Sequence, residues 1–176
     1  MEITRIGVIG AGQMGNGIAQ VAACAGYQVM MIDIEQSYVD KGMSSIEFSL
    51  SKLVSKDRMS QEEADTALAL VNTSTSKEAA SQCDLVIEAI PEIPDLKFSI
   101  FSELDGICKD STILASNTSS ISIDEIAAAT NRPDRVIGMH FMNPVPIMKL
   151  VEIINGSQTS NETNSAVVEA AERMGK

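Results

Sequence analysis

The sequence predicts an α/β protein whose mostly parallel, doubly wound β-sheet has helices on both faces. Apolar runs of strand length alternate with helical patterns along all 176 residues. The runs are apolar at successive positions, which is typical of strands buried on both faces. The first run leads through a glycine-rich turn into an apolar helix. The length fits one domain, residues 1–176.

Each predicted element follows from its local pattern. Short apolar runs predict strands at Arg5–Gly10, Gln28–Asp33, Val71–Ser74, Leu85–Ile90, Thr112–Ser116, Val136–Gly138 and Lys149–Ile154. Longer stretches with helical spacing predict helices at Gln13–Ala25, Ser37–Lys56, Gln61–Leu70, Asp95–Cys108, Ile123–Ala129 and Glu162–Arg173. Capping boxes are expected at Ser60–Glu63, Ser122–Glu125 and Thr159–Glu162, and Gly26 is expected to end the first helix.

Composition and charge exclude several classes of function. The formal net charge of −11 argues against binding to nucleic acid or to an anionic membrane surface. No apolar run predicts a signal peptide or a membrane span, so a cytoplasmic protein is expected. Cys24, Cys83 and Cys108 lack the spacing of metal ligands, which predicts reduced, mostly buried thiols and no metal site.

The turn after the first strand has the pattern that binds dinucleotide phosphates. It reads Gly10-Ala11-Gly12-Gln13-Met14-Gly15, with G-x-G-x-x-G spacing. The first glycine permits the tight turn, the second lets the backbone approach a pyrophosphate, and the third lets the helix pack on the sheet. The amide groups at the helix N-terminus attract the phosphates. Between a strand and a helix, this pattern predicts a Rossmann-type domain.

Acidic residues follow two of the predicted strands. Asp33 ends the second strand, 18 residues after Gly15, where a carboxylate binds ribose hydroxyls and repels a 2′-phosphate, so NAD is favoured over NADP. The alternative is a glycine-rich turn with a chance acid. Glu92 and Lys97 follow the fourth strand and are candidates near the nicotinamide ribose, with a solvated helix start as their alternative.

His140 is the only histidine of the chain, and histidine is the residue type most used to exchange protons at neutral pH. A single histidine is more often a core residue than a catalyst. Here, however, Pro144 and Pro146 predict a turn. If the next strand pairs antiparallel, Glu152 comes near His140. The apolar neighbours of Glu152 suggest a buried strand, in which a carboxylate needs a partner. Such a pair suits a general base.

These segments together resemble the 3-hydroxyacyl-CoA dehydrogenase family. The resemblance rests on the glycine turn, Ser116-Asn117-Thr118-Ser119-Ser120, His140-Phe141-Met142-Asn143-Pro144-Val145-Pro146 and Lys149-Leu150-Val151-Glu152. It covers essentially the whole chain and is strongest to the bacterial short-chain members, the 3-hydroxybutyryl-CoA dehydrogenases. Another Rossmann enzyme, such as a 2-hydroxyacid or sugar-acid dehydrogenase, would share the glycine turn and Asp33 but has no reason to carry the segment that begins at His140.

The resemblance implies a role for each matching residue. His140 is the expected general acid/base, Glu152 its electrostatic partner, and Ser119 the donor to the C3 oxygen of the substrate. The implied NAD contacts are Gly10, Gly12, Gln13, Met14, Gly15, Asp33, Ala89, Ile90, Glu92, Lys97 and Asn117. The implied contacts with the acyl-CoA substrate are Ser49, Lys52, Lys56 and Asn143. Lys52 and Lys56 share one helix face, which also fits a solvated lysine face.

The family has a second, helical domain, which supplies a further asparagine to the active site and most of the dimer interface. The chain resembles the cofactor-binding domain without it. Two hypotheses follow. The chain is a 3-hydroxyacyl-CoA dehydrogenase in which His140 takes the proton of the 3-hydroxyl while hydride leaves C3, or it is a module that binds NAD and CoA with little turnover. Because family members homo-oligomerise through the second domain, a monomer or a different association is expected here.

Overall fold

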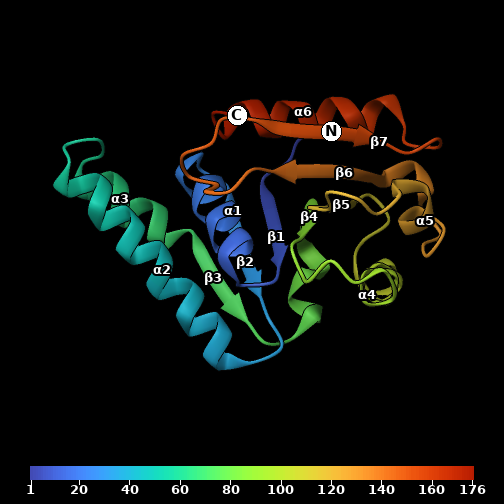
Figure 1. Ribbon diagram of the computed structural model, residues 1–176, viewed down its shortest axis with the longest axis horizontal. Helices are drawn as coiled ribbons and strands as arrows, with labels where there is room; N and C mark the ends of the chain where they lie inside the picture. The colour runs from blue at the N-terminus through green and yellow to red at the C-terminus, as the bar shows by residue number, and fades with distance from the viewer.

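Seven strands form one sheet in the order β3-β2-β1-β4-β5-β6-β7 in the computed structural model, which describes residues 1–176 (Figure 1). The strands are β1 (Arg5–Ile9), β2 (Gln28–Ile32), β3 (Val71–Ser74), β4 (Leu85–Glu88), β5 (Ile113–Ser116), β6 (Val136–Phe141) and β7 (Val151–Asn155). All neighbouring pairs are parallel except β6 and β7. The chain winds outward from β1 in both directions, as in Rossmann-type domains. The predicted fold class is confirmed.

Helices cover both faces of the sheet. They are α1 (Gln13–Cys24), α2 (Gln36–Ser55), α3 (Gln61–Ala69), α4 (Pro94–Ile107), α5 (Ile123–Ala127) and α6 (Asn161–Arg173), with the 3-10 helices η1 (Lys77–Gln82) and η2 (Pro133–Arg135). The six α-helices match the predicted ones, with ends that differ by up to two residues. The two 3-10 helices were not predicted, because six and three residues are too short to show a helical period. None of the helices is both long and apolar enough to cross a bilayer.

Two apolar cores form on the two faces because successive strand residues point in opposite directions. The larger core has 30 buried residues and lies under α1, α2, α3 and α6. The smaller core has 14 and lies under η1, α4 and α5. In β4, Leu85 and Ile87 enter the larger core and Val86 the smaller one. The same alternation places Glu88, the last residue of β4, on the α4 side of the sheet.

The helix ends confirm two predictions and contradict two others. Gly26 ends α1 with a positive φ of 86°, and the N–H of Tyr27 reaches the carbonyl of Ala22 in a Schellman arrangement. At α3, Ser60 and Glu63 form the predicted capping box, with bonds of 3.1 and 2.8 Å. At α5, the Ser122 side chain makes no capping hydrogen bond, which nothing in the structure explains.

The third predicted capping box is wrong by one residue. Thr159 cannot cap α6, because its hydroxyl donates to the carbonyl of Val136 and accepts from the N–H of Gly156. Ser160 caps the helix instead, by accepting from the N–H of Thr163. The predicted capping box therefore fails because tertiary contacts occupy the side chain that the local pattern selected.

Burial corrects two further expectations. Cys24 is exposed, because it ends α1, whereas Cys83 and Cys108 are buried as predicted. Burial raises the pKa of Cys83 to about 12 and that of Cys108 to about 11, so both stay protonated thiols. Glu152 was expected in a buried strand, but β7 is the edge of the sheet and the Glu152 side chain is 52% exposed. Its pairing with His140 therefore does not depend on burial.

The two serines at helix N-termini provide a stability test. Replacing Ser60 with alanine removes a capping hydrogen bond and should lower the free energy of unfolding by about 1 kcal/mol. Ser122→Ala removes no such bond and should change it by less than about 0.5 kcal/mol. Urea unfolding followed by circular dichroism measures both. Equal losses in the two variants would show that the capping box at α3 contributes nothing specific.

Candidate active site

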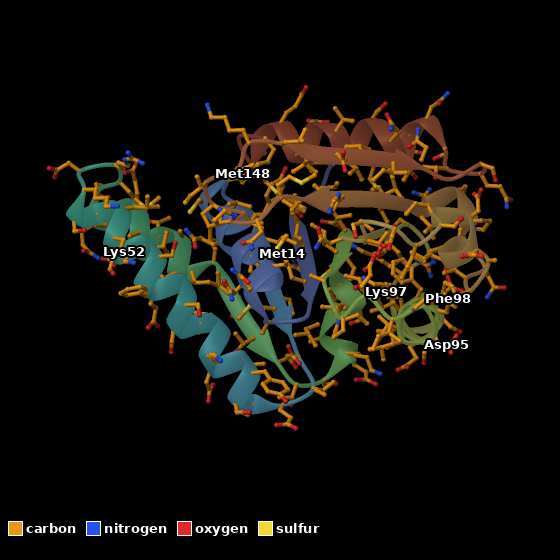
Figure 2. All side chains as sticks on the ribbon, viewed as in Figure 1. Met14, Lys52, Asp95, Lys97, Phe98 and Met148 are labelled. Atoms are coloured by element: carbon orange, nitrogen blue, oxygen red, sulfur yellow. The ribbon has the colours of Figure 1, made fainter.

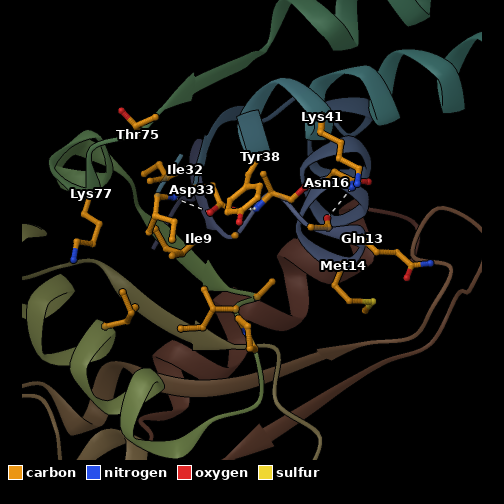
Figure 3. Close-up of a pocket in the computed structure, with 18 of the residues that line it drawn as sticks. Ile9, Gln13, Met14, Asn16, Ile32, Asp33, Tyr38, Lys41, Thr75 and Lys77 are labelled. Atoms are coloured by element: carbon orange, nitrogen blue, oxygen red, sulfur yellow. Dashed lines mark hydrogen bonds between the residues drawn. The ribbon is translucent and has the colours of Figure 1, made fainter. Parts of the chain in front are cut away.

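A cleft of about 1020 Å³ opens at the carboxyl ends of β1, β2 and β4 (Figure 3). Such a position, outside the strand ends where the strand order reverses, is where open α/β sheets bind ligands. The implied NAD contacts that line this cleft are Gly10, Gly12, Gln13, Met14, Asp33, Ala89 and Ile90. The structure therefore brings together seven residues from three separate βα turns.

The glycine turn has the geometry that a bound pyrophosphate requires. Gly10 has a φ of 104°, which L side chains rarely adopt. A Cβ on Gly15 would lie 1.8 Å from the carbonyl oxygen of Gly10, so only glycine permits α1 to start this close to β1. A Cβ on Gly12 would meet no atom within 4 Å, so the backbone there is open to the cleft. The turn thus fits a dinucleotide, although Gly15 itself does not line the cleft.

Asp33 lines the first cleft at the end of β2 and is fixed by backbone groups. Its Oδ2 accepts the N–H of Ala11 at 2.7 Å, and its Oδ1 accepts the N–H of Ile34 at 2.7 Å. These bonds connect the end of β2 to the glycine turn. Because the side chain is only half-buried and lines the cleft, its remaining acceptor positions are open to ribose hydroxyls.

Several residues of this cleft were not found from the sequence. They come from α2 and from the segment after β3, and are Tyr38, Lys41, Ser45, Thr75 and Lys77. Figure 3 shows Tyr38, Lys41, Thr75 and Lys77 around the cleft. Tyr38, Lys41 and Ser45 are spaced by three and four residues, so one face of α2 is turned to the cleft. That spacing was visible in the sequence, but nothing in it showed that this face lies beside Asp33.

A second cleft, of about 330 Å³, shares Met14, Ala89 and Ile90 with the first and is contiguous with it. Its other lining residues are Glu92, Asn117, Ser119, His140, Phe141, Met142 and Asn143. It therefore gathers the ends of β4, β5 and β6, and every implied residue of the chemical step except Glu152. A ligand with its adenosine half at Asp33 and its phosphates at the glycine turn would extend into this second cleft.

His140 and Glu152 form the pair that the sequence predicted. They are directly opposite in the antiparallel register of β6 and β7, and His140 Nδ1 lies 2.7 Å from Glu152 Oε2. An ionised carboxylate at Nδ1 favours the tautomer with hydrogen on Nδ1, which leaves the Nε2 lone pair free to accept a proton. Nε2 has no hydrogen-bond partner in the protein. The His140 side chain is 21% exposed and borders the second cleft.

The loop after β5 is held by Glu92. Its Oε1 accepts the N–H of Ser119 at 3.0 Å and a short hydrogen bond from the hydroxyl of Thr118. Burial would raise the pKa of Glu92, but the bonds from Thr118 and Lys97, with the charge of Lys97, outweigh burial and hold that pKa at about 2. Glu92 is therefore ionised at neutral pH, and it positions the loop that carries Ser119.

Asn117 and Lys97 are placed differently from each other. Asn117 lines the second cleft, and its Oδ1 accepts the N–H of Phe141, which ties the end of β5 to the end of β6. Lys97 is fully buried, lines neither cleft, and bonds to Glu88 and Glu92. The resemblance implied that Lys97 contacts the cofactor. In this structure any influence of Lys97 on the site must pass through Glu92.

Of the implied CoA contacts, only Asn143 reaches the second cleft. Ser49, Lys52 and Lys56 lie in the carboxyl-terminal part of α2 or just after it, and line neither cleft. Figure 2 shows Lys52 on α2, well away from Met14. Lys52 Nζ lies 4.2 Å from the ring centre of Phe48, which is 62% exposed. These residues continue the helix face that begins at the first cleft with Lys41 and Ser45.

The glycine turn and the carboxylate after β2 line one cleft, and a histidine paired with a carboxylate lines the adjoining cleft. Together they define a dinucleotide-binding domain of the dehydrogenase type. No group of three or more His, Cys, Asp or Glu side chains is placed to hold a metal ion. Comparison with known families is more specific. The chain belongs to the 3-hydroxyacyl-CoA dehydrogenase family, whose NAD-binding domain matches residues 5–176.

Individual relatives agree with this assignment. The chain is 51% identical over 176 residues to a probable 3-hydroxybutyryl-CoA dehydrogenase of Bacillus subtilis, and covers 100% of itself and 61% of that protein. It is 47% identical over 174 residues to the 3-hydroxybutyryl-CoA dehydrogenase of Bradyrhizobium diazoefficiens, and the match covers 99% of this chain and 59% of that protein. The crystal structure of (S)-3-hydroxybutyryl-CoA dehydrogenase from Ralstonia eutropha matches with a TM-score of 0.98 at 47% identity. The match covers 99% of this chain and 62% of that one. The chain thus spans about 60% of the length of these relatives.

The low pKa of Glu92 predicts a pH-dependent contribution to stability. Its pKa falls from an ordinary 4.5 to about 2 on folding, so the ionised form stabilises the fold above pH 4.5 and this contribution is lost as the pH falls towards 2. Urea midpoints should therefore differ between wild type and Glu92→Gln at pH 7 and converge near pH 2. Glu47→Gln, at an exposed carboxylate of α2 without a hydrogen bond, is the control. A Glu92→Gln difference that persists at pH 2 would contradict this assignment.

Proposed function

We propose that this chain carries the NAD(H) site and the proton-transfer pair of a 3-hydroxyacyl-CoA dehydrogenase. The observation that carries the proposal is the 2.7 Å contact of His140 Nδ1 with Glu152 Oε2. His140 lines the second cleft, which shares Met14, Ala89 and Ile90 with the cleft of the glycine turn and Asp33. The adenosine half would lie at Asp33, the pyrophosphate at Gly12 and the nicotinamide half beside Asn117. The bound nicotinamide would supply the hydride acceptor or donor.

The reaction assigned to this pair interconverts a 3-hydroxyacyl-CoA and a 3-oxoacyl-CoA. In oxidation, the O–H proton of the 3-hydroxyl passes to His140 Nε2 while the C3 hydride departs, so two electrons and one proton leave the substrate carbon with the hydride. In reduction, His140 returns its proton to the C3 oxygen. Glu152 stabilises the imidazolium that forms, and Ser119 donates to the C3 oxygen.

The substrate class is supported by the relatives and by one feature of α2. The Bacillus subtilis and Bradyrhizobium diazoefficiens relatives are named 3-hydroxybutyryl-CoA dehydrogenases. On a chain of net charge −11, Lys52 and Lys56 lie on a helix face that continues from the first cleft. We assign this face, with Ser49, to the phosphates of CoA, and Asn143 to the acyl end of the substrate.

A second candidate function is binding without efficient turnover. The observation that favours it is the openness of the pair: in the described chain the Glu152 side chain is 52% exposed, and water there weakens the electrostatic help that a closed site provides. Calorimetric titration with NADH, beside an assay of acetoacetyl-CoA reduction on the same chain, separates the two candidates. NADH binding without reduction would favour the binding module.

Replacing the histidine tests the catalytic assignment. His140→Gln should lower the rate of acetoacetyl-CoA reduction by roughly 10²–10⁴-fold, because a positioned general acid is lost. NADH affinity should change by less than roughly threefold, since His140 is not assigned to the cofactor. Glu152→Gln should keep the fold but shift the pH–rate profile, because the carboxylate that orients His140 is gone. A near-normal rate for His140→Gln would overturn the assignment.

Asp33 should decide the choice between the two nicotinamide cofactors. Its carboxylate repels a 2′-phosphate, so NADH should bind more tightly than NADPH. Asp33→Asn keeps an oxygen acceptor for the N–H of Ala11 and removes the charge. The ratio of the Kd of NADPH to the Kd of NADH should therefore fall by roughly tenfold. Calorimetry with both nucleotides measures this. Equal affinity of wild type for NADH and NADPH would show that Asp33 does not select the cofactor.

A further inference from the structure

A group of three charged side chains, two of them fully buried, lies at the second cleft and joins β4 to α4. It consists of Glu88, Lys97 and Glu92, and we call it the charge triad. Lys97 Nζ lies 2.7 Å from Glu88 Oε1 and 3.1 Å from Glu92 Oε2. The side chains of Glu88 and Lys97 have no exposed surface. Figure 2 shows Lys97 on the inner side of α4, with the exposed Asp95 on the other.

Glu88 is held as a hydrogen-bond acceptor from three directions. Besides Lys97, the N–H of Ile90 donates to its Oε1 at 2.7 Å and the hydroxyl of Ser116 donates to its Oε2 at 2.6 Å. This is the bonding of a carboxylate. Two charges buried this deeply are costly to desolvate, and an apolar pair of similar volume would stabilise a fold at least as well. A gain in folding stability therefore does not explain why Glu88 and Lys97 are charged residues.

Glu92 connects the triad to the cleft. Its side chain is 36% exposed and lines the second cleft beside Asn117 and Ser119. Lys97 is shared by two carboxylates, so the triad has two negative charges and one positive charge. Its net charge of one negative unit is presented at the cleft wall through Glu92, which stays ionised at neutral pH because its pKa is held at about 2.

We propose that Glu88 and Lys97 are positioning residues that set the charge of the cleft wall at Glu92, and thereby favour the oxidised, positively charged nicotinamide over the reduced one. This inference rests on the proposed function, which places the nicotinamide half in the second cleft. A net negative wall attracts a cationic ring more strongly than a neutral ring. The negative wall should therefore increase the affinity for NAD⁺ relative to that for NADH. This difference in affinity lowers the reduction potential of the bound couple.

The test is the pair of dissociation constants for NAD⁺ and NADH, measured by calorimetry on wild type and Glu88→Gln. The substitution keeps the volume and leaves Lys97 paired with Glu92 as a neutral unit. The Kd of NAD⁺ relative to that of NADH should rise roughly tenfold. A tenfold change corresponds to about 30 mV for a two-electron couple. Circular dichroism checks that each variant is folded.

Two further variants separate charge from structure. Asp95→Asn removes the same charge from the exposed surface of α4 and should leave the Kd ratio unchanged. The double variant Glu88→Gln with Lys97→Met removes one charge of each sign, so Glu92 again presents a net negative wall. Its Kd ratio should return at least to the wild-type value. A merely structural role for Glu88 predicts a further loss in the double variant instead.

The outcomes distinguish this inference from the proposed function. Equal weakening of NAD⁺ and NADH by Glu88→Gln, or no recovery in the double variant, overturns the role of the triad and leaves the NAD site intact. Failure of the wild-type chain to bind either nucleotide overturns both. If Glu88→Gln does not fold, the double variant carries the test. It should keep the wild-type ratio, and adding Glu92→Gln should then raise that ratio roughly tenfold.

Discussion

The close packing of α1 against β1 is the constraint on which the rest of the site depends. A side chain at Gly15 would overlap the carbonyl of Gly10, so the helix can begin this near the strand only with glycine at that position. The approach brings the N-terminal amides of α1 to the strand ends and leaves the open backbone of Gly12 between them. Parallel pairing of β1 with β2 and β4 then aligns two more βα turns on the same edge.

Charge is arranged along this edge in a definite order. A carboxylate stands at each end of the crevice, Asp33 at one end and Glu92 at the other, with the neutral glycine turn between them. Each carboxylate is fixed by backbone N–H groups, from Ala11 and Ile34 for Asp33 and from Ser119 and Ser120 for Glu92. Side chains oriented in this way need little reorganisation when a ligand arrives. The same groups that hold the loops therefore also provide the binding surface.

The sequence was sufficient for the sheet, its helices and the contact of His140 with Glu152, because each leaves a short-range signal. Strands and helices follow from the spacing of apolar residues, and the pairing of His140 with Glu152 follows from the proline turn between them. Lys97 shows the opposite case. Its position after the fourth strand suggested a surface contact, but it lies fully buried between two carboxylates. The exposure of Cys24 and Glu152 was likewise misjudged, because exposure depends on what packs above a residue.

The amino-acid sequence by itself therefore determined the fold class, the positions of the strands and helices along the chain, the glycine turn and the contact of His140 with Glu152. These are properties of neighbours along the chain, which local sterics and hydrogen bonding control. Only the tertiary structure decided that one face of α2 lines the first cleft, that Glu88 shares Lys97 with Glu92, and that Glu152 is open to solvent at the sheet edge. Burial depends on how helices and strands pack against one another, and no local pattern contains that information.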